Sequence, residues 1–434
     1  MLITKFCAVL LTISLLLSST VAEILGEVDC EFAFLMIPVL LLFTGFLSSS
    51  CRSAASQSKE NIVLLTSGHL ANAAERAGFR VEESKAEIPG AVRPRLGFRT
   101  LAYKDPRLAY LRERYQLRKR IESAQDEWTA QLSLKQWVSQ SISNGDPRVS
   151  ANTAAEILRY AAQGETFYCT HYAITYVESA LALGWQARMV GVDRRHGPDG
   201  LESAHHGVAE VWSNQFSKWV VIDPQSNLHF EKDGIPLSAW EIRTEWLNNQ
   251  GANVDHVVGV PPQTVKKNPA IIWWKRRNED ETAIFFWLYI EDDAVTRTWN
   301  NRFRYIFPQD RHNCDLIWYQ NDPSGRGRLH DGYCNNRFIP TWSIEDAYWT
   351  VGIVEVRLAG VSAGKLRLSL DSYCPNQTWF EAAFDDRGWE RIEGQAIVTW
   401  KLKAGANRLR LRTVSQGGVK GPEAMLFLRL KQHS

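Results

Sequence analysis

A cysteine, a histidine and an aspartate stand in an order that suits nucleophilic catalysis. Cys169 opens a predicted helix, and a helix N-terminus favours the thiolate, which is the attacking form of cysteine. The pair His205–His206 begins a predicted strand, and Asp223 ends the strand after it. A nucleophile, a base and a carboxylate that orients the base make up a catalytic triad. A lone cysteine is more often a small core residue, so the prediction depends on its partners.

The elements that must position these residues follow from the local sequence pattern. The helix that begins at Cys169 should end at Gly184, and Gly184–Val192 predicts a turn and then a strand. Ala204–Trp212 predicts a second strand, which follows a charged loop. Lys218–Asp223 predicts a third strand, joined to the second by a short turn. Alternating, β-rich segments of this length favour a hairpin.

Cys169 and three later motifs resemble those of the transglutaminase-like superfamily, a branch of the papain-type thiol enzymes. The motifs follow in the family's order and are Leu183–Arg188, His206–Val211 and Trp219–Pro224. The resemblance covers about a third of the chain, which is the size of one small domain. It implies an α+β fold, a papain-like transglutaminase core of helices and antiparallel sheet. It also selects His206 as the base and Asp223 as its orienting carboxylate.

Two positions depart from the family pattern. Tyr168 precedes the cysteine where a small residue is common, so we expect a narrower approach to the thiol. Val208 stands two residues after the histidine where an aromatic residue is common, which alters the expected substrate contacts there. His205 should lie on the opposite face of its strand from His206. His171 should lie on a helical face that points away from the nucleophile.

The resemblance implies an enzyme that works on amide bonds of a protein or peptide substrate. Cys169 would attack a carboxamide or peptide carbonyl to give a thioester, and His206 would pass the thiol proton to the leaving amine. Water as the acceptor makes a peptidase or deamidase, and an amine makes a protein crosslinker; both stay open. The Cys169 backbone N–H is one expected oxyanion donor. Three upstream residues are open candidates for the second: Gln136, Gln140 and Gln163.

A binding protein that keeps this fold without turnover is the second hypothesis. The chain holds 17 Trp residues, and those in its C-terminal half could recognise carbohydrate or protein at the cell surface. Large aromatic residues are usually buried, which favours a packing role for most of them. The presence of all three triad residue types favours the enzyme, so we expect selective alkylation of Cys169 near neutral pH.

The composition excludes several classes of partner. The 434 residues include 50 Lys or Arg and 48 Asp or Glu, a net charge of +2, so no nucleic acid partner is expected. The sequence shows no metal-ligand spacing and no glycine-rich phosphate loop after a strand, and we expect neither a metal nor a cofactor. Three cysteines of the C-terminal half allow one disulfide whose pairing stays open: Cys314, Cys334 and Cys374.

The first 51 residues predict a leader or a membrane anchor. Phe6–Ala22 and Phe32–Ser50 are uncharged runs, marginal for a bilayer span and long enough for a signal sequence. The small residues before Cys51 resemble a bacterial lipoprotein signal, with Cys51 acylated. This favours an exported, membrane-anchored protein, periplasmic or at the cell surface, with a cell-envelope polymer as a candidate partner. The alternative is a membrane hairpin with Lys5 and Arg52 inside, which leaves the enzyme on the cytoplasmic face.

Shifts in composition divide the rest of the chain. Residues 52–100 predict a polar tether, and residues 101–262 predict the transglutaminase-like catalytic domain, ended by a proline-containing boundary. Residues 263–434 hold short alternating segments separated by turns, which predicts an antiparallel β-sandwich. Its expected role is to position the catalytic domain on a bulky substrate. A 52–262 fragment should then keep its activity on a small amide.

Overall fold

The computed structural model describes residues 64–94, 98, 100–193, 205–249, 251–265, 287–291, 303–307, 337–340, 344–392, 394 and 396–432. By its internal contacts the chain divides into residues 1–63 and 64–434, and all described residues belong to the second unit. The leader or anchor predicted for residues 1–51 lies outside the described residues and stays a prediction. Among the described helices, none has the length and apolar composition needed to cross a bilayer.

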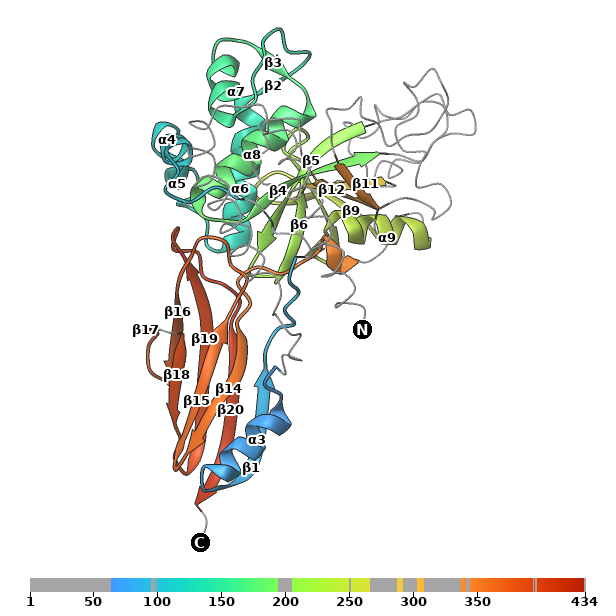
Figure 1. Ribbon diagram of the computed structural model, residues 1–434. Helices are drawn as coiled ribbons and strands as arrows, with labels where there is room; N and C mark the ends of the chain where they lie inside the picture. Colours follow the sequence, from blue (N-terminus) through green and yellow to red (C-terminus); the bar gives the residue numbers. More distant parts are fainter. Residues whose placement is uncertain are drawn as a thin grey trace, which may run out of the picture. The chain divides into compact units, whose positions relative to one another are not determined.

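A helical layer surrounds the predicted nucleophile. Its described helices are α4 (Pro106–Arg114), α5 (Leu117–Arg120), α6 (Glu127–Ser141), α7 (Ala154–Ala161) and α8 (Cys169–Leu183). Three of them, α4, α6 and α7, begin at a capping residue whose side chain accepts a hydrogen bond from a backbone N–H of the first turn. These capping residues are Asp105, Asp126 and Thr153. α8 is the central helix, because 13 of its 15 residues are buried. It contacts α4, α6 and α7 (Figure 1).

α8 also packs on a six-stranded sheet of order β13-β12-β11-β4-β5-β6. β4 (Ala187–Asp193), β5 (His205–Ser213) and β6 (Lys218–Ile222) are the antiparallel strands predicted from the sequence. β11 (Trp287–Glu291) pairs with β4, β12 (Phe303–Phe307) pairs with β11, and β13 (Arg337–Pro340) runs parallel to β12.

The last three strands correct the predicted domain boundary. All of them come after residue 263, yet they extend the sheet that carries His206 instead of joining the C-terminal sandwich. A strand pattern in the sequence shows which residues are extended, but it does not show which free edge will accept their N–H and C=O groups. The edge of β4 takes β11, and the predicted sandwich domain of residues 263–434 is wrong in this part.

A second, four-stranded sheet has the order β10-β9-β7-β8. Its strands are β7 (Leu228–Lys232), β8 (Ile235–Pro236), β9 (Asp255–Val258) and β10 (Gln263–Val265), and α9 (Ala239–Asn249) falls between β8 and β9 in sequence. β2 (Ser143–Asn144) and β3 (Thr166–Phe167) form a short parallel pair that leads into α8. Asp223 and Leu228 exchange two backbone hydrogen bonds of 2.9 Å, which tie the end of β6 to the start of β7.

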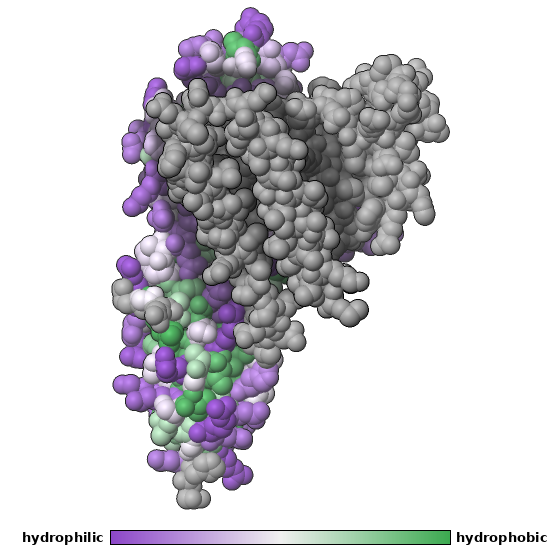
Figure 2. Space-filling model, viewed as in Figure 1, coloured by the Kyte–Doolittle hydropathy of each residue, from purple (hydrophilic) through white to green (hydrophobic). Residues whose placement is uncertain are grey.

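Two antiparallel sheets enclose a second apolar core (Figure 1). Their orders are β1-β20-β19-β16-β17 and β14-β15-β18. The strands from the C-terminal half are β14 (Glu355–Ser362), β15 (Lys365–Asp371), β16 (Gln377–Phe384), β17 (Glu390–Ile392), β18 (Ile397–Lys401), β19 (Gly405–Ser415) and β20 (Ala424–Gln432). Apolar and charged side chains mix over the visible face of these strands (Figure 2). The predicted fold class, an α+β core followed by an antiparallel sandwich, is confirmed.

The N-terminal part of the described chain completes this sandwich and is not the tether predicted for residues 52–100. α3 (Ser67–Arg76) begins at a capping box formed by Thr66 and His69. β1 (Phe79–Glu87) pairs antiparallel with β20 from end to end. Five of the nine residues of β1 are charged, so the segment resembles a solvated linker in sequence. Main-chain hydrogen bonds to β20, which composition does not reveal, hold it in the sheet.

Close backbone contact joins the end of α8 to the turn after β19. Gly184 has a φ of +97°, and a Cβ on it would lie 2.9 Å from the Cα of Gly417, so a side chain has no room there. Trp349 and Val351 also belong to the apolar core around α8. Trp219 donates its indole N–H to the carbonyl of Trp349 at 2.7 Å. The core around α8 therefore needs residues from beyond position 340.

A fully buried ion pair connects β4 and β5. Arg188 donates to Glu210 through Nε at 3.0 Å and through Nη2 at 2.7 Å, and neither side chain is exposed. Arg188 also donates to the carbonyl of Ala347. The second oxygen of Glu210 accepts from the Tyr348 hydroxyl and from the N–H of Ala239. Charge-assisted bonds of this kind are strong and directional, so they fix these four segments against one another.

Replacing Arg188 by Met should lower the free energy of unfolding by about 3–5 kcal/mol, because it leaves the Glu210 carboxylate buried without its charge partner. Urea denaturation of the full chain measures the change. Lys232→Met is the matched control, since it removes a cation from a partly exposed pair with Glu245 and should cost much less stability. Equal losses in the two variants would contradict the structural role of the buried pair.

Candidate active site

Cys169 is the first residue of α8. The N-cap before it, Tyr168, has extended backbone and makes no capping hydrogen bond through its side chain, and the first turn carries no acidic residue. The positive end of the helix dipole therefore meets the thiol without a competing carboxylate from that turn. Cys169 is 9% exposed. A helix start is the kind of position that lowers a thiol pKa in cysteine enzymes.

His206 on β5 links the cysteine to the aspartate. Its Nε2 lies 3.0 Å from Oδ2 of Asp223, and the Cys169 side chain is close enough to its ring to favour the charged imidazole. Burial disfavours a charged imidazole, but the charge and hydrogen bond of Asp223 and the contact with Cys169 outweigh it and raise the pKa of His206 to about 10. The ring is therefore protonated at neutral pH, which is the form that pairs with a thiolate.

Asp223 is held as a carboxylate at the end of β6, where it is 2% exposed. Its Oδ1 accepts the backbone N–H groups of Gln225 and Ser226 at 3.1 and 3.2 Å. Burial acts to raise the pKa of Asp223, but the charge and hydrogen bond of His206 and the Ser226 contacts prevail and lower it. The structure thus brings together the three residues that the sequence singled out, from a helix start, a strand and a strand end.

A glycine sets the spacing between β5 and α8. A Cβ on Gly207 would lie 3.2–3.4 Å from three atoms of Thr170, including its backbone N, which is tighter than ordinary contact. Because Gly207 follows His206 and Thr170 follows Cys169, this close approach brings the base to the nucleophile. A glycine inside a strand pattern often marks a close backbone approach, so the sequence did contain a signal for this contact.

His171 packs between two aromatic rings and does not fit the role of the catalytic base. Its ring centroid lies 4.8 Å from that of Phe167 and 4.5 Å from that of Tyr168. Burial lowers the pKa of His171 to about 4, so the ring is neutral at physiological pH. The backbone of His205 pairs with Asp193, while its side chain lies outside the described part of the chain.

The upstream glutamines lie in unlike environments. Gln136 on α6 accepts the N–H of Val260 through Oε1 at 2.9 Å, so its carbonyl is used to hold the chain after β9. Gln140 and Gln163 are exposed. The Cys169 N–H at the start of α8 stays the expected oxyanion donor, and the second donor stays unassigned.

A buried lysine near Asp223 was missed in the sequence. Lys135 on α6 is fully buried, and its Nζ lies 3.2 Å from Nδ1 of His229. The Nε2 of His229 lies 2.8 Å from Glu231. A possible signal was the position of Lys135, three residues from both Leu132 and Val138 on the apolar face of the predicted helix.

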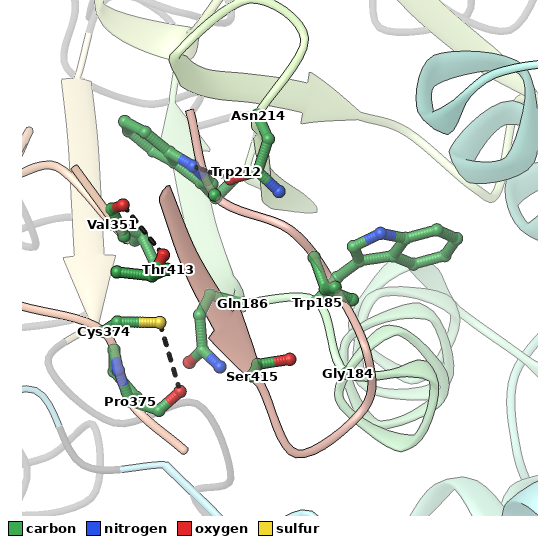
Figure 3. Close-up of a pocket in the computed structure, with 13 residues that line it drawn as sticks. Gly184, Trp185, Gln186, Trp212, Asn214, Val351, Cys374, Pro375, Thr413 and Ser415 are labelled. Carbon is green, nitrogen blue, oxygen red and sulfur yellow. Dashed lines mark hydrogen bonds between the residues drawn. The ribbon is translucent and has the colours of Figure 1, made fainter. Parts of the chain in front are cut away.

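A separate pocket lies at the opposite end of α8 and contains none of the three predicted residues (Figure 3). Its lining includes Gln186, Cys374 and Ser415. Burial raises the pKa of the Cys374 thiol to about 11, so this cysteine is a poor nucleophile compared with one at a helix start. Cys374 forms no disulfide, and Cys314 and Cys334 lie outside the described residues. Among the described residues, no cluster of three or more His, Cys, Asp or Glu could hold a metal ion.

Known proteins offer a comparison for the central part of the chain. The family model of the transglutaminase-like superfamily matches residues 115–224, a range that contains Cys169, His206 and Asp223. None of the curated proteins matches the chain. A solved structure described as a "Putative Cysteine Protease from Cytophaga hutchinsonii" is similar at 13% identity and a TM-score of 0.22. That match covers 27% of this chain and 37% of the other protein, so the chain spans little more than a third of it. Residues 115–224 of this chain are a transglutaminase-like superfamily domain.

Proposed function

We propose that this protein is a thiol enzyme that transfers or hydrolyses acyl groups at amide bonds through a thioester on Cys169. The observation that carries the proposal is the buried chain in which Asp223 binds His206 and His206 contacts Cys169 at the start of α8. A transglutaminase-like domain over residues 115–224 supports a cysteine enzyme. The substrate class that we propose is a protein or peptide carrying an accessible amide.

The first half of the reaction forms the thioester. The Cys169 thiolate attacks the substrate carbonyl carbon, and the C=O electron pair moves onto oxygen, where the Cys169 N–H stabilises it. Collapse of this intermediate restores the C=O bond and breaks the C–N bond. Asp223 holds Nε2 of His206, so Nδ1 is the nitrogen that delivers a proton to the leaving amine. The products are an acyl thioester, an amine and a neutral imidazole.

The second half returns the enzyme to its starting state. Nδ1 of His206 takes a proton from the acceptor, which attacks the thioester carbonyl. Collapse of the second intermediate expels the Cys169 thiolate and leaves His206 protonated, so protons and charges balance over the cycle. Water as the acceptor gives an acid, and a primary amine gives a new amide. Tyr168, the N-cap of α8, is 44% exposed and borders the nucleophile, where it is placed to contact the bound substrate.

To identify the acceptor, the full chain is incubated with a glutamine-containing peptide, with and without a primary amine, and the product masses are measured by mass spectrometry. A gain of the amine with loss of ammonia identifies transfer. Release of ammonia with incorporation of water into the peptide identifies deamidation. Cleavage into two shorter peptides identifies a peptidase. No change to the peptide, together with an unreactive Cys169, would favour the binding-protein hypothesis instead.

Cys169→Ala should lower kcat/KM on a peptide amide by about 10³-fold or more, because the attacking atom is lost while substrate binding is kept. Cys374→Ala is the matched control, since it removes the other described thiol, which is buried away from the three residues, and it should keep activity within about two-fold. Steady-state kinetics on both purified variants makes the comparison. Activity retained by the Cys169 variant would refute the mechanism.

Asp223→Asn should move the alkaline limit of activity to lower pH. The Asp223 charge and hydrogen bond help to raise the pKa of His206 to about 10 against its burial, so their loss lowers that pKa and the imidazolium gives up its proton earlier as pH rises. The full pH profile of kcat/KM measures the shift. An unchanged alkaline limit, in a variant that folds normally, would contradict the role of Asp223.

A further inference from the structure

A buried lysine contacts the strand that follows the carboxylate of the proposed triad. Lys135 on α6 has no exposed surface, and burial of a charged ammonium is unfavourable unless it is paired or can lose its proton. Its Nζ donates to Nδ1 of His229 at 3.2 Å. The other ring nitrogen of His229 bonds Glu231 at 2.8 Å. The chain of contacts therefore runs from Lys135 through an imidazole to a partly exposed carboxylate.

The fold couples this chain to Asp223. Asp223 and Leu228 exchange two backbone hydrogen bonds, and His229 is the next residue after Leu228. The imidazole that contacts Lys135 is therefore anchored one residue from the partner of Asp223. The Lys135 and Asp223 charges attract each other, as do those of Lys135 and Glu231.

Within the described part of the chain, the contacts of the elements beside Lys135 involve neutral groups. On α6, one turn earlier, the neutral amide of Gln131 donates to the carbonyl of Trp212. On β9, Val257 stands opposite His229. On α8, the Tyr172 hydroxyl donates to Ile142, and the Asp223 charge adds to burial in raising its pKa to about 12, so it stays neutral.

Charge balance then suggests what Lys135 does. A Cys169 thiolate and a protonated His206 cancel, and Asp223 leaves one net negative charge in a buried site. We propose that Lys135 is a positioning residue whose positive charge balances Asp223 and thereby holds the Cys169–His206 pair in its charged, reactive form below neutral pH. This inference rests on the proposed function, because it concerns the reactivity of the same thiol.

Lys135 should carry its positive charge only below about neutral pH. Burial lowers the pKa of the Lys135 ammonium to about 7, against the attraction of Asp223 and Glu231. Below that pH the lysine is charged and stabilises both the thiolate and the Asp223 carboxylate. Above that pH it is neutral and has little effect on them. Removing it should therefore alter the acid side of a reactivity profile and spare the alkaline side.

The experiment measures the rate at which iodoacetamide alkylates Cys169 in the full chain between pH 4 and 10, followed by mass spectrometry of the Cys169 peptide. In Lys135→Met, which replaces the lysine by an apolar chain of similar length, the acid limb should move up by about half to one pH unit. The alkaline limb should stay in place. Lys232→Met is the control, because it removes a partly exposed cation on β7 that pairs with Glu245, and both its limbs should match the wild type.

A second variant tests the same idea without deleting the lysine. Glu231→Gln removes a charge that raises the Lys135 pKa, so the lysine loses its proton at lower pH, and the alkylation rate of this variant should approach that of Lys135→Met between that pH and neutrality. Circular dichroism identifies which variants fold. A folded Lys135→Met variant whose acid limb coincides with the wild type would overturn the inference. If the wild-type Cys169 itself titrates like an ordinary thiol, the proposed function fails as well, so the two failures are told apart.

Discussion

The guanidinium of Arg188 imposes the strictest requirement on the fold. An arginine cannot escape burial by losing its proton, so the protein must surround it with partners. Glu210, the carbonyl of Ala347 and two aromatic faces supply them, the ring centroids of Trp219 and Tyr348 lying 4.1 and 4.9 Å from its Cζ. These partners come from β5, β6 and the segment before β14. The strands that carry His206 and Asp223 are therefore held together by the contacts of the Arg188 guanidinium.

Arg188 and Lys135, both fully buried, illustrate two uses of charge. Arg188 is permanently charged, saturated by its partners and suited to structure. Lys135 has one imidazole contact and a pKa brought to about 7 by burial, so its charge responds to its surroundings. An ammonium can be tuned in this way and a guanidinium cannot. In the proposed mechanism the tunable cation supports reactivity, whereas the fixed one joins β4 to β5.

The proposed site could be recognised in the sequence because each of its parts is local. The helix start at Cys169, the strand that carries His206 and the strand end at Asp223 are each recognisable within a few residues, and the turns between them are short. Gly207 and Lys135 escaped prediction because their roles depend on partners from other elements, Thr170 on α8 and His229 on β7. Such tertiary contacts leave only weak marks on a single sequence.

The same limit explains why β1 and β11 were misplaced. Both were extended segments with no local indication of a partner, and one of them, the charged β1, resembled a linker. Sheet edges decided the outcome, because an unpaired row of N–H and C=O groups is satisfied by whichever segment reaches it. β20 takes a strand from the start of the described chain and β4 takes one from beyond residue 263. The chain therefore passes between the sandwich core and the core around α8 more often than its composition suggests.

These crossings decide whether residues 52–262 can act alone. Without the later residues, β4 loses β11 as its edge partner, and the Trp219 indole loses the carbonyl of Trp349 that it binds at 2.7 Å. Arg188 loses the Ala347 carbonyl, which leaves part of a buried guanidinium unsatisfied. The expected division of labour, with a complete catalytic domain before residue 263 and a substrate-positioning sandwich after it, therefore does not match the packing. The transglutaminase-like domain depends on the C-terminal half for its core, so a shared core, and not residue 262, defines the folding unit that carries the site.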